Sequence, residues 1–364
     1  SKTVVPGLFQ THIHQFNSDG AKMDKAWLSF GVTSVREPGA EPYEALERRE
    51  AWMSGQRVGP REFYANILEG NRLFYWMNTA VVPNAQLEME LQRAIDLDYD
   101  FIKTYETMDH EVQKRIVDFA HAHGLPVASH ELYPAAVYGV DAVEHFGTRD
   151  RMEFADRISI SRKVYDDVVQ IQARSGMYIS PTTAGRAPQA TYMTQMDKHI
   201  GILDLPQVKS FAPRYTRAHA DMMGYMHSLY GDSGPTQERN ELASLAKMKK
   251  AGVVFGTGTD GGTLQDGYSV IMEMIHFAEA FGPYEALRAG TIDSARITGV
   301  DQYLGSIETG KIADMVVVDG DPLKNVADLY KVDTVIKDGR AYRLADLLGH
   351  YDRTMARRSS SPEQ

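Results

Sequence analysis

Residues 126–145 read PVASHELYPAAVYGVDAVEH, and this stretch decides the fold. It contains two short apolar runs that each end in a histidine, Val127-Ala128-Ser129-His130 and Ala142-Val143-Glu144-His145. Short apolar runs bounded by turn residues are typical of buried strands in a parallel sheet. Either histidine alone could be a satisfied core residue. Two histidines at successive strand ends are harder to explain by packing, so we interpret His130 and His145 as metal ligands.

The same pattern extends in both directions, where short β-rich runs alternate with helical sequence. Two intervening helices are expected at 109–123 and 238–252, with Asp109 as N-cap and with Gly124 and Gly252 as stop signals. Eight parallel strands close a barrel that side chains fill. We therefore predict an α/β fold, a (β/α)8 TIM barrel over residues 1–300. Its strands are expected at 8–14, 32–37, 62–66, 101–105, 126–130, 142–145, 177–181 and 253–257.

A histidine pair ends the first expected strand. His12 and His14 are two residues apart, so on a strand both imidazoles point to the same side and can reach one ion. An H-x-H pair alone is weak evidence, because two histidines could also fill the barrel or lie on the surface. Their position at a strand end favours a metal site, since barrel catalysis takes place at the C-terminal ends of the strands.

Lys103 lies within the apolar run Phe101-Ile102-Lys103-Thr104-Tyr105, where an unpaired ammonium would be costly to bury. One interpretation is a buried ion pair with a barrel carboxylate such as Glu37 or Glu144. The other is that the neutral amine has reacted with carbon dioxide. The resulting carbamate is anionic, can bridge two cations, and removes the buried positive charge.

Asp260 follows the eighth expected strand and is a candidate both for metal binding and for proton transfer. Residues 256–261 read GTGTDG, which formally matches G-x-G-x-x-G. We reject a dinucleotide site, because an acid occupies the turn and the match does not open a two-strand nucleotide unit. His276, on the helix after this strand, could also reach the site.

Composition narrows the function classes. Among 364 residues, 43% are hydrophobic and 24% charged, which is globular composition. No apolar stretch approaches the roughly 18 to 20 residues of a membrane span, and a net charge of -10 argues against nucleic acid as a partner. The absence of cysteine leaves imidazole, carboxylate or modified lysine as metal ligands and fits an oxidising or a reducing compartment, so localisation stays open.

A long excursion at 182–236 separates the seventh strand from the helix that precedes the eighth. Loops after barrel strands lie on the catalytic face, so this one is a candidate lid or specificity element, although an insertion that only packs is an equal alternative. Tyr105, Tyr133 and Arg186 could orient a substrate carbonyl or carboxylate. The two tyrosines could equally be barrel packing, and we assign none of the three a catalytic role.

After residue 300 the sequence changes character. Glycines and a proline separate short apolar runs at 313–318 and 334–336, which indicates antiparallel strands outside the barrel. We expect residues 301–345 to form the C-terminal strands of a small β-sandwich and residues 346–364 to form a tail.

These stretches together resemble the amidohydrolase superfamily, in particular its binuclear group related to imidazolonepropionases and to Xaa-Pro and Xaa-Lys/Arg dipeptidases. The resemblance covers nearly the whole chain and rests on 5–8 with the following His12-Ile13-His14, 31–35, 101–105, the histidine strands, 256–260, and 304–307 with 310–314. It implies that His12, His14 and Asp260 bind one divalent metal ion and that His130 and His145 bind another. Carboxylated Lys103 would bridge the two ions, for which zinc is the expected metal.

Two features depart from the family pattern. Gln10 stands where the family usually has an aspartate, which bears on the support of the histidine pair. The family usually builds its β-sandwich from strands of both chain ends, and we expect the N-terminal half to be missing here. The resemblance implies that a longer polypeptide with another N-terminal domain, or a separate chain, completes it. Ser1 in place of Met fits a trimmed or a processed chain.

The expected function is hydrolysis of an amide or peptide-like C–N bond, linear or cyclic, by a hydroxide that bridges the metals, with Asp260 transferring the proton. The substrate would be a small molecule or short peptide. Two alternatives stay open: an esterase, lactonase or phosphotriesterase on the same scaffold, and a metal-free binding or assembly subunit. Association between copies of the chain also stays open.

Overall fold

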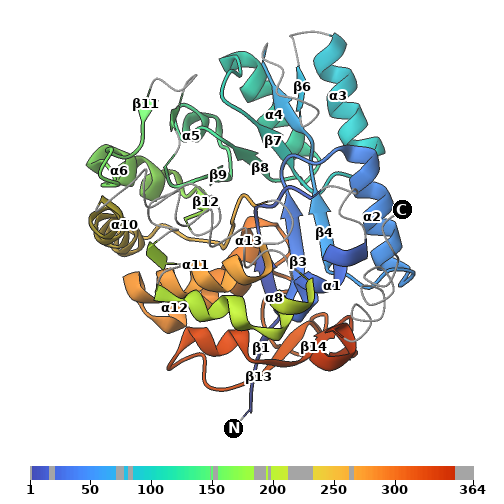
Figure 1. Cartoon of the computed structure of the whole chain (residues 1–364). Helices are drawn as coiled ribbons and strands as arrows, with labels where there is room; N and C mark the ends of the chain where they lie inside the picture. Colours follow the sequence, from blue (N-terminus) through green and yellow to red (C-terminus); the bar gives the residue numbers. More distant parts are fainter. Residues whose placement is uncertain are drawn as a thin grey trace, which may run out of the picture.

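Helices and strands alternate along the chain, with the helices around the outside of the parallel strands (Figure 1). The computed structural model describes residues 2–15, 21–70, 78–80, 85–147, 149–150, 155–183, 194–195, 198–211, 233–261 and 266–348. The larger helices are α1 (Ala21–Ser29), α2 (Pro42–Met53), α3 (Ala85–Asp96), α4 (His110–Ala122), α6 (Asp166–Ser175), α10 (Ser233–Lys250) and α11 (Asp266–Phe281). Shorter ones are α5 (Ala135–Tyr138), η2 (Ile200–Asp204), α8 (Pro206–Phe211), α12 (Pro283–Arg288), η3 (Ala289–Asp293), α13 (Ser294–Ile297) and η4 (Val326–Tyr330).

Parallel strands form two sheets. One has the order β2 (Leu8–Gln10), β3 (Val32–Glu37), β4 (Arg61–Tyr64). The other has the order β12 (Tyr178–Ser180), β9 (Ala142–Glu144), β8 (Val127–Ser129), β7 (Ile102–Thr104), β5 (Ile67–Glu69), β6 (Asn78–Ala80). All neighbours in both sheets are parallel. Seven of the eight expected strands therefore have a counterpart, and the mixed α/β class is confirmed. The pair β10 (Arg149–Asp150) and β11 (Ala155–Asp156) forms a separate antiparallel ribbon.

The eighth expected strand, 253–257, is not a regular strand, but it lies between the two sheets. Phe255 forms a parallel bridge with Ile179 of β12, and the Gly256 amide donates to the Ile179 carbonyl at 2.9 Å. On the other side, the Thr11 amide donates to the Thr257 carbonyl at 2.7 Å. Regular pairing stops here because the chain turns at Gly258, whose α-carbon packs against Ser180 and His12.

The helix α4 shows how local sequence sets the elements. The Asp109 side chain accepts hydrogen bonds from the amides of Glu111 and Val112, so it is the N-cap expected from the sequence. The helix buries an apolar stripe against β7 and β8, made by Val112, Ile116, Val117 and Ala120. It ends before Gly124, which has a φ of 74° that favours glycine. This packing fixes the ends of the two strands that it covers.

The C-terminal region forms a four-stranded antiparallel sheet in the order β1 (Lys2–Pro6), β13 (Met315–Asp319), β14 (Val332–Lys337), β15 (Arg340–Arg343). The N-terminal strand β1 pairs with β13 along its whole length, whereas the sequence analysis placed residues 2–6 with the barrel and expected no N-terminal contribution. Gly7 lies between β1 and β2, where the chain leaves the antiparallel sheet and enters the parallel one. An added β-carbon there would lie 2.1 Å from the Thr33 hydroxyl, so a glycine lets the chain pass this close to β3.

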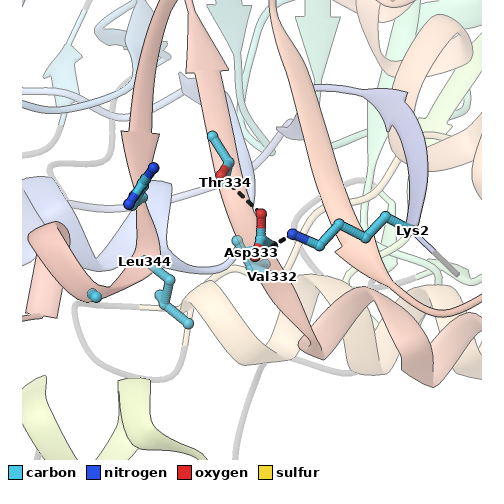
Figure 2. A pocket seen from close by; sticks show the side chains of 7 residues that line it. Lys2, Val332, Asp333, Thr334 and Leu344 are labelled. Atoms are coloured by element: carbon cyan, nitrogen blue, oxygen red, sulfur yellow. Dashed lines mark hydrogen bonds and ion pairs between the residues drawn. The ribbon is translucent and has the colours of Figure 1, made fainter.

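A polar pocket lies at the edge of this sheet (Figure 2). Lys2 Nζ pairs there with Asp333 Oδ1 at 2.8 Å. The pocket contains none of the expected metal ligands; its lining residues are Lys2, Val332, Asp333, Thr334, Arg343, Leu344 and Ala345. It therefore belongs to the C-terminal sheet and not to the candidate site.

Several sequence predictions fall outside the described residues. Arg186 and most of the 182–236 excursion lie outside them, as do residues 349–364 of the expected tail. Residues 344–348 are helical and Leu347 is 2% exposed, so packed structure continues past 345. In the part of the chain that the structure describes, no helix has both the length and the apolar character to cross a bilayer.

Candidate metal centre

The structure brings all six sequence-predicted site residues to the same end of the parallel strands. Lys103 lies within β7, His130 follows β8, and His145 follows β9. His12 and His14 follow β2, and Asp260 follows the 253–257 segment. Parallel strands end at a common edge, which explains how residues spread over some 250 positions of sequence converge.

The four histidines form a continuous cluster. The ring centroids of His12 and His145 are 4.6 Å apart, and those of His145 and His130 are 4.4 Å apart. His14 continues the cluster on the other side of His12, at 5.2 Å. All four are largely buried. Burial lowers the pKa of His130 and His145 well below its ordinary value, so these rings are neutral and can act as ligands.

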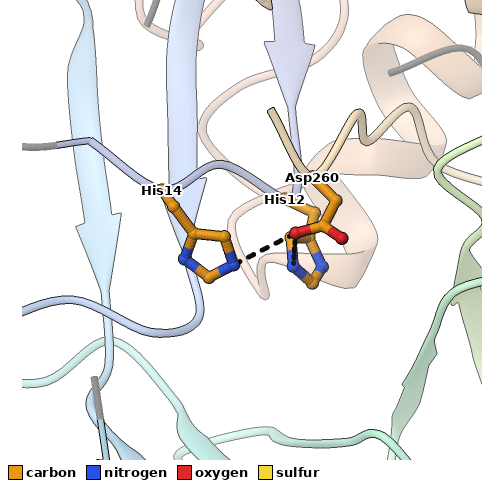
Figure 3. A group of neighbouring side chains, drawn as sticks. All are labelled: His12, His14 and Asp260. Atoms are coloured by element: carbon orange, nitrogen blue, oxygen red, sulfur yellow. Dashed lines mark ion pairs between the residues drawn. The ribbon is translucent and has the colours of Figure 1, made fainter. Parts of the chain in front are cut away.

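Asp260 faces the histidine pair (Figure 3). Its Oδ1 atom lies 3.2 Å from His14 Nε2 and 3.5 Å from His12 Nε2. The ligand atoms of these three residues all lie within 4.8 Å of one another, a spacing that suits a single ion. Burial by itself would raise the pKa of Asp260, but the surrounding imidazoles, with hydrogen bonds from His12 and His14, hold the pKa well below its usual range. The carboxylate is therefore ionised at neutral pH.

Two of the site residues have strained backbone conformations. His145 has a φ of 63° and Asp260 a φ of 52°, in the left-handed region that non-glycine residues rarely adopt. The Asp260 amide donates to the His12 carbonyl at 2.9 Å, and the His145 amide donates to the Ser180 carbonyl at 2.8 Å. Such conformations cluster at functional sites, where the surroundings hold them in place.

Lys103 is 1% exposed, and its Nζ atom has no hydrogen-bond partner among the described residues. The ion pair considered from the sequence does not form, because Glu144 bonds to Arg36 at 2.9 Å and Glu37 bonds to Arg48. Burial lowers the pKa of Lys103 to about 8. A buried amine without a partner, beside four imidazoles and a carboxylate, fits a group that is modified or bound to metal.

Supporting residues orient the ligands. Glu144 Oε2 lies 2.8 Å from His12 Nδ1, and Thr182 Oγ1 lies 2.8 Å from His145 Nδ1. Both contacts are made by Nδ1, so the Nε2 atom of each ring remains available to a metal ion. Hydrogen bonds of this kind fix the tautomer of metal-binding histidines. The sequence analysis did not single out Glu144 or Thr182 for this role. The sequence feature that could have identified them is a polar residue within a buried strand, as at Glu144, or soon after one, as at Thr182.

Gln10, which stands where the family usually has an aspartate, is fully buried. It links the segment of His12 with the turn that carries Asp260. Its Oε1 atom accepts from the Thr259 amide at 3.1 Å and from the His12 amide at 3.3 Å. Its Nε2 atom donates to the Thr259 hydroxyl. Glutamine thus positions His12 and the turn that carries Asp260 through neutral hydrogen bonds.

The other residues considered from the sequence lie differently. The Tyr105 ring is 4.2 Å from the His130 ring, so it lies beside the cluster, whereas Tyr133 is 54% exposed. His276 is remote from the ligands and bonds to Glu241 at 3.0 Å. It forms a second group with Glu238 and Glu279, but the Lys198 ammonium already pairs with Glu238 at 2.8 Å. That group is a polar contact between α10 and α11.

Comparisons with known proteins agree with this architecture. Residues 94–342, more than half of the chain, match the amidohydrolase family. A 5-methylthioadenosine/S-adenosylhomocysteine deaminase of Thermoanaerobacter pseudethanolicus is 29% identical over 168 residues, which cover 39% of each chain. An imidazolonepropionase of Shouchella clausii is 34% identical over 106 residues, 28% of this chain and 24% of that protein. The matched segments thus span well under two thirds of these relatives.

Solved structures share the fold over nearly the whole length. A Xaa-Pro dipeptidase matches with a TM-score of 0.64 and 21% identity, over 94% of this chain and 87% of that one. Molinate hydrolase matches with a TM-score of 0.69 and 18% identity, over 94% and 84%. The family match over more than half of the chain shows that the chain belongs to the amidohydrolase family.

Proposed function

We propose that this protein is a metal-dependent hydrolase that cleaves an amide or peptide-like C–N bond, linear or cyclic. The observation that carries the proposal is the convergence of four histidines, Asp260 and a buried lysine at one end of the parallel strands. A satisfied packing core would not leave Lys103 Nζ without a hydrogen-bond partner among the described residues. The family relationship and the dipeptidase-like fold support the same class.

The scaffold that we propose is a closed (β/α)8 barrel. The Asp100 amide, just before β7, donates to the Tyr64 carbonyl of β4 at 3.2 Å, and 253–257 connects β12 with Thr11. These contacts join the two parallel sheets at both places where the regular strand pairing is interrupted, which supports a closed barrel. We propose that the barrel spans residues 7–300 and that β1 belongs with residues 301–345, which amends the division expected from the sequence.

The residues suit two divalent cations, which we take to be zinc. His12, His14 and Asp260 would hold one ion, His130 and His145 the other, and carboxylated Lys103 would lie between them. Carboxylation forms a bond between the Lys103 nitrogen and the carbon of carbon dioxide and releases one proton. A lysine pKa of about 8 keeps part of the amine neutral near pH 7, as this reaction requires.

When bound, the cations supply Lewis acidity, which acidifies water and polarises the substrate carbonyl. The residues of the chain do the rest. The Asp260 carboxylate, ionised at neutral pH, accepts a proton from the attacking water and then delivers it to the leaving nitrogen. Glu144 and Thr182 hold His12 and His145 in fixed orientations during turnover.

Deamination is the second candidate, because the curated relatives include deaminases of 5-methylthioadenosine and S-adenosylhomocysteine. Such a reaction also cleaves a C–N bond with water but releases ammonia. A panel of dipeptides, cyclic amides, esters, lactones, phosphotriesters and adenosine derivatives separates the candidates. Turnover of an amide alone supports our proposal, whereas preference for adenosine derivatives or for esters would replace it.

Metal content is the companion measurement. Elemental mass spectrometry of the purified protein should give about two transition-metal ions per chain. No metal, with no uptake on reconstitution, would refute the proposal and favour a metal-free binding subunit.

A further inference from the structure

Glu273 is a fully buried acid on α11, outside the ligand cluster. Its Oε1 atom accepts hydrogen bonds from the amide and the hydroxyl of Thr183, at 2.7 and 3.1 Å. Its Oε2 atom accepts from the Gly258 amide at 2.7 Å. One carboxylate therefore binds two loops that are 75 residues apart, counted from 183 to 258.

Each of these loops carries a part of the candidate metal centre. Thr183 follows Thr182, whose hydroxyl contacts His145. Gly258 lies two residues before Asp260 and packs against His12, since an added β-carbon would come within 2.9 Å of His12 Cβ. A displacement of the first loop would therefore move the group that contacts His145, and a displacement of the second would move Asp260.

Both loops contain residues with an unfavourable backbone. Thr182 has a φ of 53° and Asp260 a φ of 52°. A non-glycine residue in this region is unfavourable and persists only where the surroundings fix it. The Glu273 carboxylate supplies such a restraint beside both of them.

The helix that carries Glu273 is itself firmly packed. One turn further along α11, the Phe277 ring lies 5.8 Å from the Phe255 ring, and Phe281 lies 5.6 Å from Phe255. Phe277 and Phe281 stack on each other at 5.3 Å. Because Phe255 lies in the segment that leads to Gly258, these ring contacts pack the helix against that segment.

We infer that Glu273 is a positioning residue of the metal centre: it holds the loops of Thr182 and Asp260 at the separation that metal binding and turnover require. This inference rests on the proposed function, because it gives the two loops a catalytic purpose. Among the described residues, the hydrogen bonds of Glu273 go to Thr183 and Gly258 and not to the expected ligands, so its effect is indirect.

A carboxylate suits this role better than an amide. Burial raises the pKa of Glu273 to about 8, but the Thr183 and Gly258 amides can only donate, and each faces a different oxygen of the carboxyl group. Both oxygens therefore accept a hydrogen bond in either protonation state. Glutamine has nearly the same shape, but it keeps one oxygen and turns an NH2 group toward a donor. Glu273→Gln can therefore satisfy the Thr183 loop or the Gly258 amide, but not both. The glutamine side chain has the same length and occupies the same buried position, so the substitution should change little else in the structure.

The test compares the wild-type protein with Glu273→Gln, with both carrying metal. The rate of metal release to excess chelator is followed with a metal-sensitive dye, and kcat and KM are measured with the best amide of the panel. We expect release to be roughly 10- to 100-fold faster, as for other residues that support ligands, with a similar loss of kcat and little change in KM. The matched control is Glu279→Gln on the same helix. Glu279 bonds to Gln195 and Lys198 and, among the described residues, to neither Thr183 nor Gly258, so this variant should behave as wild type.

Thr183→Val provides a second variant that preserves side-chain shape. It removes only the hydroxyl bond at 3.1 Å and should accelerate metal release in the same direction by less. Release rates and kcat equal to those of wild type in both variants would overturn the positioning role while the proposed function stands. A wild-type protein that binds no metal would overturn the proposed function, and the inference with it.

Discussion

Replacing Lys103 with methionine should stabilise the metal-free protein while abolishing its activity. Burial lowers the pKa of Lys103 from its ordinary 10.5 to about 8. Each tenfold change in proton affinity is worth about 1.4 kcal/mol, so burying the charged lysine costs about 3 kcal/mol of folding free energy. Methionine fills a similar volume without charge and removes this cost.

The sign of the pH dependence follows from proton binding. Below pH 8 the lysine is protonated in both states, so the full cost is present. Between pH 8 and 10.5 only the unfolded chain binds the proton, and the stability of the wild type therefore rises with pH. The advantage of Lys103→Met should thus be about 3 kcal/mol at pH 7 and should shrink as the pH approaches 10.5.

The assay is urea unfolding of chelator-treated protein in buffer free of carbon dioxide, at pH 7 and at pH 10. Lys324→Met is the control, because this lysine side chain is 83% exposed and its replacement should change stability by less than about 0.5 kcal/mol. A Lys103→Met protein that is less stable than wild type at pH 7, or that retains turnover, would refute the reasoning.

Three further substitutions test other contacts. Asp260→Asn should leave the unfolding midpoint nearly unchanged but lower kcat by about 10²- to 10⁴-fold, since the amide cannot accept the proton; near wild-type kcat would contradict its role. Gln10→Ala removes three buried hydrogen bonds and should weaken metal binding by roughly 10- to 100-fold in a competition titration, whereas unchanged affinity would exclude a supporting role. Arg48→Met leaves the buried Glu37 and Glu62 without their shared cation and should cost about 3–5 kcal/mol in urea unfolding; a cost below about 1 kcal/mol would show that the two acids do not need this cation.

Much of this protein could be predicted from two features of the sequence: the spacing of its apolar residues and the polar residues at the ends of the expected strands. A candidate metal ligand at the end of a strand can be recognised because a histidine or an aspartate interrupts an apolar run, as at His130 and Asp260. Helix caps are visible because they depend on a few adjacent residues, and Asp109 is an example. The family relationship followed from the same ordered set and is confirmed.

Pairings between distant segments were not predictable in this way. The strand β1 looked like the entrance to the barrel, but it pairs with β13, more than 300 residues away. Nothing in the local sequence of Lys2–Pro6 specifies that partner. Glu273, likewise, reads as one acid on an apolar helix until its oxygens are seen between Thr183 and Gly258.

The alternation of strands and helices and the candidate metal-binding residues could thus be predicted from local sequence. Local hydrophobic period and side-chain type encode these properties residue by residue. The groups that satisfy the buried charges became apparent only in the folded protein: Arg36 pairs with Glu144, whereas Lys103 Nζ has no hydrogen-bond partner among the described residues. Such pairings depend on distances of about 3 Å between residues far apart in the chain, and those distances exist only after the chain has folded.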